Sequence, residues 1–164
     1  MEQSRYIKAV EMYADTLYRI ACSYCRCTAD AEDIVQCVFM KLLQVRTEFQ
    51  SDEHMKRWLI RVTVNEAKNL CRSFWKKHMV SLDAKGTITV PVYDFPSQEC
   101  SVLYDAVTAL PYKYRIVVHL YYYEEYSVRE IAEILHIKET TIQTQLMRAR
   151  KKLKAKLKED WQNE

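Results

Sequence analysis

The sequence predicts an all-α protein made of two small helical domains joined by an irregular linker. The chain has 164 residues and 49% hydrophobic residues, an ordinary globular proportion, which excludes disorder throughout. It contains only 1 Gly and 3 Pro, too few turn-forming residues for a sandwich or barrel of short strands. Its apolar residues recur instead at three- and four-residue spacing, which is the period of amphipathic helices.

Three helices are expected in the first domain, residues 1–78. The apolar spacing predicts helices over Arg5–Tyr24, Thr28–Val45 and Met55–Lys77, with Thr28 or Asp30 capping the second. A polar, charged break from Phe49 to His54 precedes the third helix. The expected core positions are Ile7, Val10, Ala14, Leu17, Ala21, Tyr24, Ile34, Val38, Leu42, Val45, Leu59, Val62, Ala67, Leu70 and Phe74.

Residues 79–99 break the helical pattern and predict an acidic linker. This stretch holds the chain's one glycine, Gly86, together with Pro91 and Pro96. Residues 79–110 have a net charge of −3, whereas 1–78 and 111–164 each have +3. A linker of about twenty residues is long for a loop inside a compact domain, which favours two domains over one. Two basic blocks also offer two separate surfaces to a polyanion.

The second domain, residues 100–164, is expected to contain a helix-turn-helix. Helices are predicted over Cys100–Leu110, Tyr112–Tyr123, Val128–Leu135 and Glu139–Lys158, and Ser127 with Glu130 forms a capping box. The expected inward positions of the first two are Val102, Leu103, Ala106, Val107, Leu110, Ile116, Val117 and Leu120. A short helix, a tight turn and a second helix are typical of DNA-binding proteins, and the alternative is an ordinary helical hairpin. The turn lacks the glycine often found there.

Two stretches have the composition of nucleic-acid contacts. Seven cations and no acid lie between Arg148 and Lys158, and phosphates would relieve their mutual repulsion. The alternative is a basic stretch that merely favours the negative end of a helix. A second basic and amide face, with nearby aromatic residues able to stack on bases, is expected on the third helix, although tryptophan at helical spacing is often a core residue. That set comprises Trp58, Arg61, Asn65, Lys68, Asn69, Arg72, Phe74 and Trp75.

Enzymes, metal proteins and membrane proteins are poorly matched by this sequence. The four histidines are isolated, and the acids Asp30, Glu32 and Asp33 have no partner cluster, so no catalytic residue, metal or cofactor is expected. No apolar signal segment and no run of about 18 apolar residues is present, which favours the cytoplasm and reduced thiols. The six cysteines are expected to be structural, with metal binding or redox sensing as the alternative: Cys22, Cys25, Cys27, Cys37, Cys71 and Cys100.

Together these residues resemble the sigma-70 family of bacterial RNA polymerase sigma factors, in its extracytoplasmic-function (ECF) subgroup. The resemblance spans about Tyr6–Leu157 and rests on three motifs in order: Asp30–Leu42, Trp58–Asn65, and Leu110-Pro111 followed by the helix-turn-helix and Arg148-Ala149-Arg150. It implies a factor without catalytic activity, built from sigma region 2 and sigma region 4. Such a factor would give core RNA polymerase its promoter specificity and assist strand opening.

The resemblance also implies partners and contact residues. Residues implied to dock on the clamp of the polymerase β′ subunit are Asp30, Asp33, Gln36, Phe39 and Met40. Residues implied to bind the minus-ten promoter element are Phe49, Trp58, Arg61, Asn65, Lys68, Asn69 and Arg72. Residues implied to bind the minus-thirty-five element are Thr140, Thr141, Gln143, Thr144, Met147, Arg148, Arg150 and Lys151. The polymerase β flap and an anti-sigma factor are further implied partners, and the acidic linker would occupy the nucleic-acid path of the polymerase.

The sequence departs from the family pattern at two places. In the recognition helix, Gln143 and Gln145 stand where cations are usual, and glutamine can read adenine edges without neutralising phosphate. Ser51 occupies the place of the usual glycine in the loop before the third helix. Two other functions stay open from the residues alone: a stand-alone helix-turn-helix regulator with an N-terminal dimerisation or sensing module, and a small helical enzyme.

Overall fold

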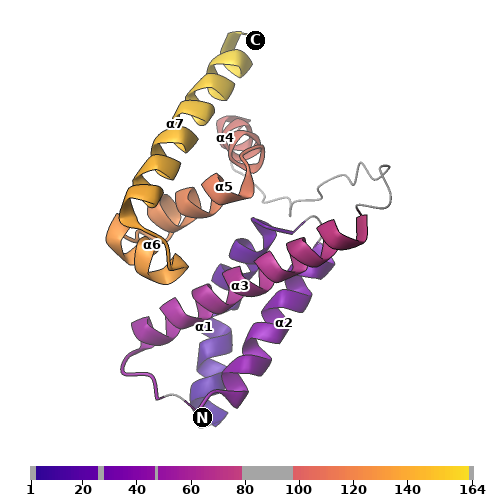
Figure 1. The fold of residues 1–164 in the computed structure, drawn as a ribbon, viewed down its shortest axis with the longest axis vertical. Helices are drawn as coiled ribbons and strands as arrows, with labels where there is room; N and C mark the ends of the chain where they lie inside the picture. Colours follow the sequence, from indigo (N-terminus) through magenta and orange to yellow (C-terminus); the bar gives the residue numbers. More distant parts are fainter. Residues whose placement is uncertain (1–2, 26–27, 47, 79–97, 163–164) are drawn as a thin grey trace. The chain divides into compact units, whose positions relative to one another are not determined.

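The structure is a computed structural model that describes residues 3–25, 28–46, 48–78 and 98–162. Within those ranges the chain forms seven α-helices and one short π-helical turn, with no β-strand (Figure 1). It divides into two compact units, Met1–Pro91 and Val92–Glu164. The predicted all-α class with two helical domains is confirmed. Most of the expected linker, residues 79–97, lies outside the described residues.

The first unit is a bundle of three helices, α1 (Gln3–Cys22), α2 (Thr28–Gln44) and α3 (Asp52–His78). Each helix packs against the other two, as the ribbon shows (Figure 1). Burying an aliphatic side chain of Leu or Ile size stabilises a fold by about 1.5–3 kcal/mol, so a small set of them holds the bundle together. The largest fully buried side chains of this unit are Leu17, Ile20, Val38, Leu42, Met55, Leu59, Ile60 and Val64.

The face that α1 buries differs from the expected one. Ile7, expected in the core, is 50% exposed, and the buried positions are Ala9, Tyr13, Leu17, Ile20 and Ala21. Tyr13 is one of the core residues that were not expected. Its ring is buried while its hydroxyl donates to the carbonyl oxygen of Asp52 at 3.2 Å, so an amphipathic residue that was left out of the apolar stripe takes a core position.

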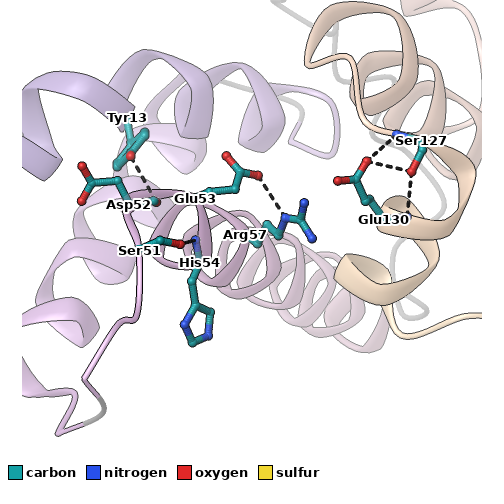
Figure 2. A network of polar contacts seen from close by, with 8 residues as sticks. All are labelled: Tyr13, Ser51, Asp52, Glu53, His54, Arg57, Ser127 and Glu130. Atoms are coloured by element: carbon teal, nitrogen blue, oxygen red, sulfur yellow. Dashed lines mark hydrogen bonds and ion pairs between the residues drawn. The ribbon is translucent and has the colours of Figure 1, made fainter.

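Helix α3 begins three residues earlier than expected. The Ser51 hydroxyl accepts a hydrogen bond from the backbone N–H of His54 at 3.0 Å, which satisfies one of the unpaired amides at the helix start (Figure 2). Asp52 and Glu53 in the first turn favour the positive end of the helix dipole. The stretch 52–54, which looked like a polar break, is therefore the capped first turn of the helix.

The second unit contains α4 (Gln98–Thr108), α5 (Tyr112–Val118), the π-helical turn η1 (His119–Tyr123), α6 (Val128–Leu135) and α7 (Glu139–Gln162). Helix α7 packs against α4, α5 and α6 (Figure 1). Because α4 packs mainly on α7, its outer side stays uncovered, and Leu103, expected in the core, is 49% exposed. Buried residues of this unit include Ala106, Leu110, Tyr114, Ile116, Val117, Leu120, Ile131, Ile134, Ile142, Leu146 and Ala149.

The helix expected over Tyr112–Tyr123 is continuous but widens at its end. Its last five residues form η1, where the N–H of Glu124 bonds to the carbonyl of His119 at 3.1 Å. Single π-turns of this kind are frequent near functional sites. Leu120 remains fully buried, while Tyr122 and Tyr123 are 56% and 60% exposed.

Candidate polymerase and nucleic-acid interfaces

The outer face of α2 is a continuous surface of mixed polarity, named here the α2 face: Asp33, Gln36 and Met40. All three side chains are exposed, Met40 by 56%. They lie opposite the buried residues Val38 and Leu42, as helical spacing requires. The α2 face can therefore meet a partner without any rearrangement of the core.

Two other residues expected on the α2 surface lie elsewhere. Asp30 is half-buried in the first turn of α2. Phe39 is only 6% exposed and packs edge to face against Tyr6, with ring centroids 6.3 Å apart. Phe39 therefore supports the α2 face from below rather than forming part of it.

An ion pair ties α2 to α3 beside this surface. Lys41 of α2 donates to the carboxylate of Glu66 of α3, and this bond raises the pKa of the Lys41 ammonium. The Cys37 thiol lies 3.8 Å from the other oxygen of the same carboxylate. An exposed pair of this kind contributes little to stability, so it marks the contact between α2 and α3 rather than holding it.

The loop before α3 is held by contacts to α1 and by its own aromatic residues. Arg5 donates to the carbonyl oxygen of Phe49 at 3.3 Å, and Tyr13 bonds to Asp52 as described above (Figure 2). Phe49 is 6% exposed, with its ring centroid 5.5 Å from that of Trp58 and 5.6 Å from that of His54. Phe49 was expected to contact DNA, yet in this structure it anchors the loop and leaves the half-buried Trp58 nearer the surface.

The predicted polar face of α3, named here the α3 face, lies on the outside of the bundle: Arg61, Asn65, Lys68, Asn69 and Arg72. Asn65, Asn69 and Arg72 are exposed, and Arg61 and Lys68 are half-buried. Burial, and secondly the neighbouring charge of Arg72, lowers the pKa of the Lys68 ammonium. A nearby anion would offset both effects. The side chains of Phe74 and Trp75 lie outside the described part of the structure.

The opposite side of α3 differs slightly from the expected core. Leu59 and Ala67 are buried as expected, but Val62 and Leu70 are half-buried, and Ile60, Thr63 and Val64 are buried instead. Thr63 is accommodated because its hydroxyl donates to the carbonyl of Leu59 at 2.9 Å.

The predicted helix-turn-helix is present, formed by α6 and α7. Ser127 caps α6, with the N–H of Glu130 bonded to the Ser127 hydroxyl at 3.3 Å and the Glu130 carboxylate bonded to the Ser127 N–H at 2.9 Å (Figure 2). His136 then reverses the chain in the left-handed conformation, φ 53° and ψ 45°, the position where glycine is common. The turn therefore forms with histidine at the position where glycine is often found.

Helix α7 presents a polar outer surface, named here the α7 face: Thr140, Thr141, Gln143, Thr144, Met147, Arg148 and Lys151. All of these side chains are exposed. The buried residues Ile142, Leu146 and Ala149 hold the other side of the helix against its domain. The hydroxyl of Thr144 donates to the carbonyl of Thr140 at 2.8 Å and so is already used within the helix. Gln143, beside it in the first turns, has a longer polar side chain than the threonines of this face.

Arg150 has a contact that the sequence did not predict. Its Nε atom donates to the hydroxyl of Tyr122 at 2.7 Å. The run Tyr121-Tyr122-Tyr123 was visible in the sequence, but no pattern connects it with an arginine 28 residues later. Arg150 is exposed, yet it bonds to a residue of η1 and is not counted in the α7 face.

The described residues contain no cluster of three or more His, Cys, Asp or Glu side chains able to hold a metal ion. Cys22, Cys25, Cys37 and Cys71 are not joined in disulfides, and burial raises the pKa of the Cys22 thiol. The side chains of Cys27 and Cys100 lie outside the described part of the chain. Within that part, no helix has the length and apolar composition needed to cross a membrane.

Comparison with known proteins identifies both units. Residues 9–77 match the family model of sigma-70 region 2, and residues 100–153 match that of sigma-70 region 4. The chain belongs to the sigma-70 family of RNA polymerase sigma factors. Region 2 therefore contains α1–α3, and region 4 contains α4–α7 with the helix-turn-helix.

Similar sequences place this sigma factor in the ECF group. It is 26% identical to the ECF RNA polymerase sigma factor SigW of Bacillus subtilis (strain 168), covering 96% of this chain and 91% of SigW. It is 29% identical to the ECF RNA polymerase sigma factor SigM of the same strain, covering 88% of this chain and 90% of SigM. The chain is a factor that directs promoter-specific initiation by RNA polymerase. A stand-alone helix-turn-helix regulator is not favoured, because the first half of this chain matches sigma-70 region 2.

Solved structures show the same fold. The sigma factor RpoE of Bartonella quintana, solved in complex with the anti-sigma factor NepR, superposes with a TM-score of 0.79 at 23% identity and covers 94% of this chain and 97% of its own. CnrH, solved in complex with the cytosolic domain of CnrY, superposes with a TM-score of 0.67 at 21% identity, covering 97% of this chain and 91% of its own.

Proposed function

We propose that this sigma factor docks on the β′ clamp of core RNA polymerase through the α2 face and holds promoter DNA through the α3 and α7 faces. The α3 face would bind the minus-ten element and the α7 face the minus-thirty-five element. The observation that carries the proposal is that each of these helices buries one side in its own domain and leaves the assigned residues outside.

The α2 face suits docking on another protein. Asp33 and Gln36 offer hydrogen bonds, and Met40 adds an adaptable apolar contact. The buried Val38, Phe39 and Leu42 hold the helix in the bundle, so little conformational entropy is lost on binding.

The α3 face suits a strand of DNA. Lys68 and Arg72 are close enough for their charges to affect each other, and a phosphate between them would relieve that repulsion and release counterions. Asn65 and Asn69 provide amides for base edges. We assign Phe49 to the support of the loop, with Trp58 as the aromatic residue nearer to an unpaired base when the strands open.

Three further features belong to the proposal. We infer that an anti-sigma factor regulates this chain, as supported by the similarity to RpoE, whose structure contains one. The β flap of polymerase would bind region 4. The protein would act in the cytoplasm beside the polymerase, without catalytic activity of its own.

Run-off transcription with purified core polymerase tests the function. Core enzyme plus this chain is expected to produce a defined transcript from its promoter, and core enzyme alone is not. The sigma factor should also bind promoter DNA much better with core enzyme than without it. Specific binding to duplex DNA that core enzyme does not increase, with no transcript, would instead support the stand-alone regulator.

A further inference from the structure

The segment Arg148-Ala149-Arg150, which contributes to the family resemblance, is engaged inside region 4. Ala149 is fully buried in a cluster with Leu110, Tyr114 and Val118, so its small side chain lets α7 approach the preceding helices closely. Arg148 bonds to the hydroxyl of Tyr114 in α5, which lowers the pKa of that tyrosine. The two arginines beside Ala149 thus both contact tyrosines of the preceding segment.

The contact of Arg150 is the better defined of the two. Besides the 2.7 Å bond from Nε to Tyr122, its Cζ atom lies 5.7 Å from the ring centroids of both Tyr121 and Tyr122. Those two rings meet edge to face with centroids 4.9 Å apart. A planar guanidinium can donate a hydrogen bond and stack on aromatic rings at once, whereas the ammonium of lysine is a point charge without a planar face.

The position of Arg150 on α7 separates it from the outer face. It follows the buried Ala149 and lies one turn after the buried Leu146, so it borders the packed side of the helix. Thr144 and Lys151 lie on the opposite side. Gln143 lies two turns before Arg150 on the same flank, because residues seven apart share a face.

We propose that Tyr122 and Arg150 form a clamp between η1 and α7 that sets the direction of Gln143, and that Arg150 is a positioning residue rather than a phosphate ligand. This inference rests on the proposed reading of promoter DNA by α7 and adds the residues that orient the reading helix. The clamp joins the π-turn to the flank of α7.

The test measures promoter binding by the full chain assembled with core polymerase, as a function of salt concentration. Under the clamp, Tyr122→Phe and Arg150→Ala each weaken binding about two- to tenfold, the value of one hydrogen bond. They leave the slope of log K against log salt unchanged and relax the base preference that depends on Gln143. Lys151→Ala provides the contrast, because loss of a phosphate contact reduces that slope by about 0.9.

Two further variants sharpen the comparison. Arg150→Lys keeps the charge but loses the planar contact with the two rings, so it should bind more weakly than the unchanged protein, whereas a phosphate ligand would tolerate lysine. Tyr123→Phe, at the neighbouring exposed tyrosine, keeps the ring that stacks on His119 and should leave the Arg150 contact and the base preference unchanged. The double variant Tyr122→Phe with Arg150→Ala should be no weaker than Arg150→Ala alone, since both remove one interaction.

The outcomes separate the clamp from the function on which it rests. Suppose that Arg150→Ala reduces the salt slope as Lys151→Ala does, and that Tyr122→Phe binds promoter DNA as well as Tyr123→Phe. Arg150 is then a phosphate ligand, and the clamp is wrong. If the unchanged holoenzyme shows no promoter preference, the proposed reading by α7 fails instead. Thermal unfolding of the unchanged protein, Tyr122→Phe, Arg150→Ala and the double variant then still decides whether the contact exists, because additive losses of stability would overturn it.

Discussion

His136 illustrates how a single residue accommodates a required backbone geometry. It is one of two non-glycine residues with positive φ in the described chain, the other being Glu125. Its N–H bonds to the carbonyl of Ala132, and the N–H of Ile137 reaches the same carbonyl at 3.1 Å, so the left-handed conformation closes the end of α6. The turn of the helix-turn-helix is therefore formed at some conformational cost.

We expect His136→Gly to stabilise region 4. The left-handed conformation costs a residue with a Cβ atom about 1–2 kcal/mol, which glycine avoids. Glycine also has more conformational freedom in the unfolded chain, and this offsets part of the stabilisation. A net increase of about 0.5 kcal/mol in the free energy of unfolding should appear as a rise in Tm. His136→Ala is the matched control, since alanine retains the strain. Equal Tm values for the two variants would show that φ at this position is not strained.

Gln143 is the residue that we expect to set the upstream sequence preference. It is exposed in the first turns of α7, where a helix entering the major groove meets base edges. Gln143→Ala should change which base is preferred at one position, with a loss of about 1–3 kcal/mol for the best promoter. Transcription from a set of promoter variants measures this, with Lys151→Ala as a control that weakens all promoters alike. A uniform loss for Gln143→Ala would mean that this residue does not read a base.

At the scale of the helix, one side of α2 is buried in the bundle and the other side is exposed. Ile34, Val38 and Leu42 are buried, and Asp33, Gln36 and Met40 are exposed, so the outside can change without disturbing the bundle. Surface substitutions away from special features usually alter stability by less than about 0.5 kcal/mol. Binding and folding can therefore be measured separately on this helix.

We expect Asp33→Ala with Gln36→Ala to weaken binding to core polymerase at least tenfold, because interface hydrogen bonds, especially those of a charged group, are worth about 0.5–3 kcal/mol each. Pull-down or anisotropy titration with core enzyme gives the affinity, and circular dichroism should show unchanged helix content. Glu11→Ala on α1 removes one exposed charge and serves as the charge control. Full affinity in the double variant would remove the α2 face from the polymerase interface.

Across the whole molecule, the two faces that we propose to contact DNA belong to one chain. Residues 1–78 and 111–164 each have a net charge of +3, so both domains attract the phosphate backbone, while the segment between them is acidic. When one domain holds its element, binding of the other becomes intramolecular, and each contact can be weak by itself. This explains how two small domains, each with a modest core, can select a promoter together.

Helix existence and family were predictable from local patterns. The capping box of Ser127 and Glu130 and the inward Ile142 and Leu146 could be read directly, because they depend on residues a few positions apart. The start of α3 was misplaced, since polar residues in a first turn look like a loop until a cap such as Ser51 is recognised. Errors of this kind concern boundaries and leave the order of elements correct.

The sequence by itself determined the all-α class, the two domains, the helix-turn-helix and the sigma-70 family, because periodicity, caps and motif order are local properties of the chain. Only the tertiary structure decided that Tyr13 rather than Ile7 enters the core, that Phe39 and Phe49 support their surfaces from beneath, and that Arg150 meets Tyr122. The bonds of Tyr13 to Asp52 and of Arg150 to Tyr122 join residues 39 and 28 positions apart. Such contacts depend on how whole helices pack. Helical periodicity shows which face of a helix is apolar, but it does not show which other helix that face will contact.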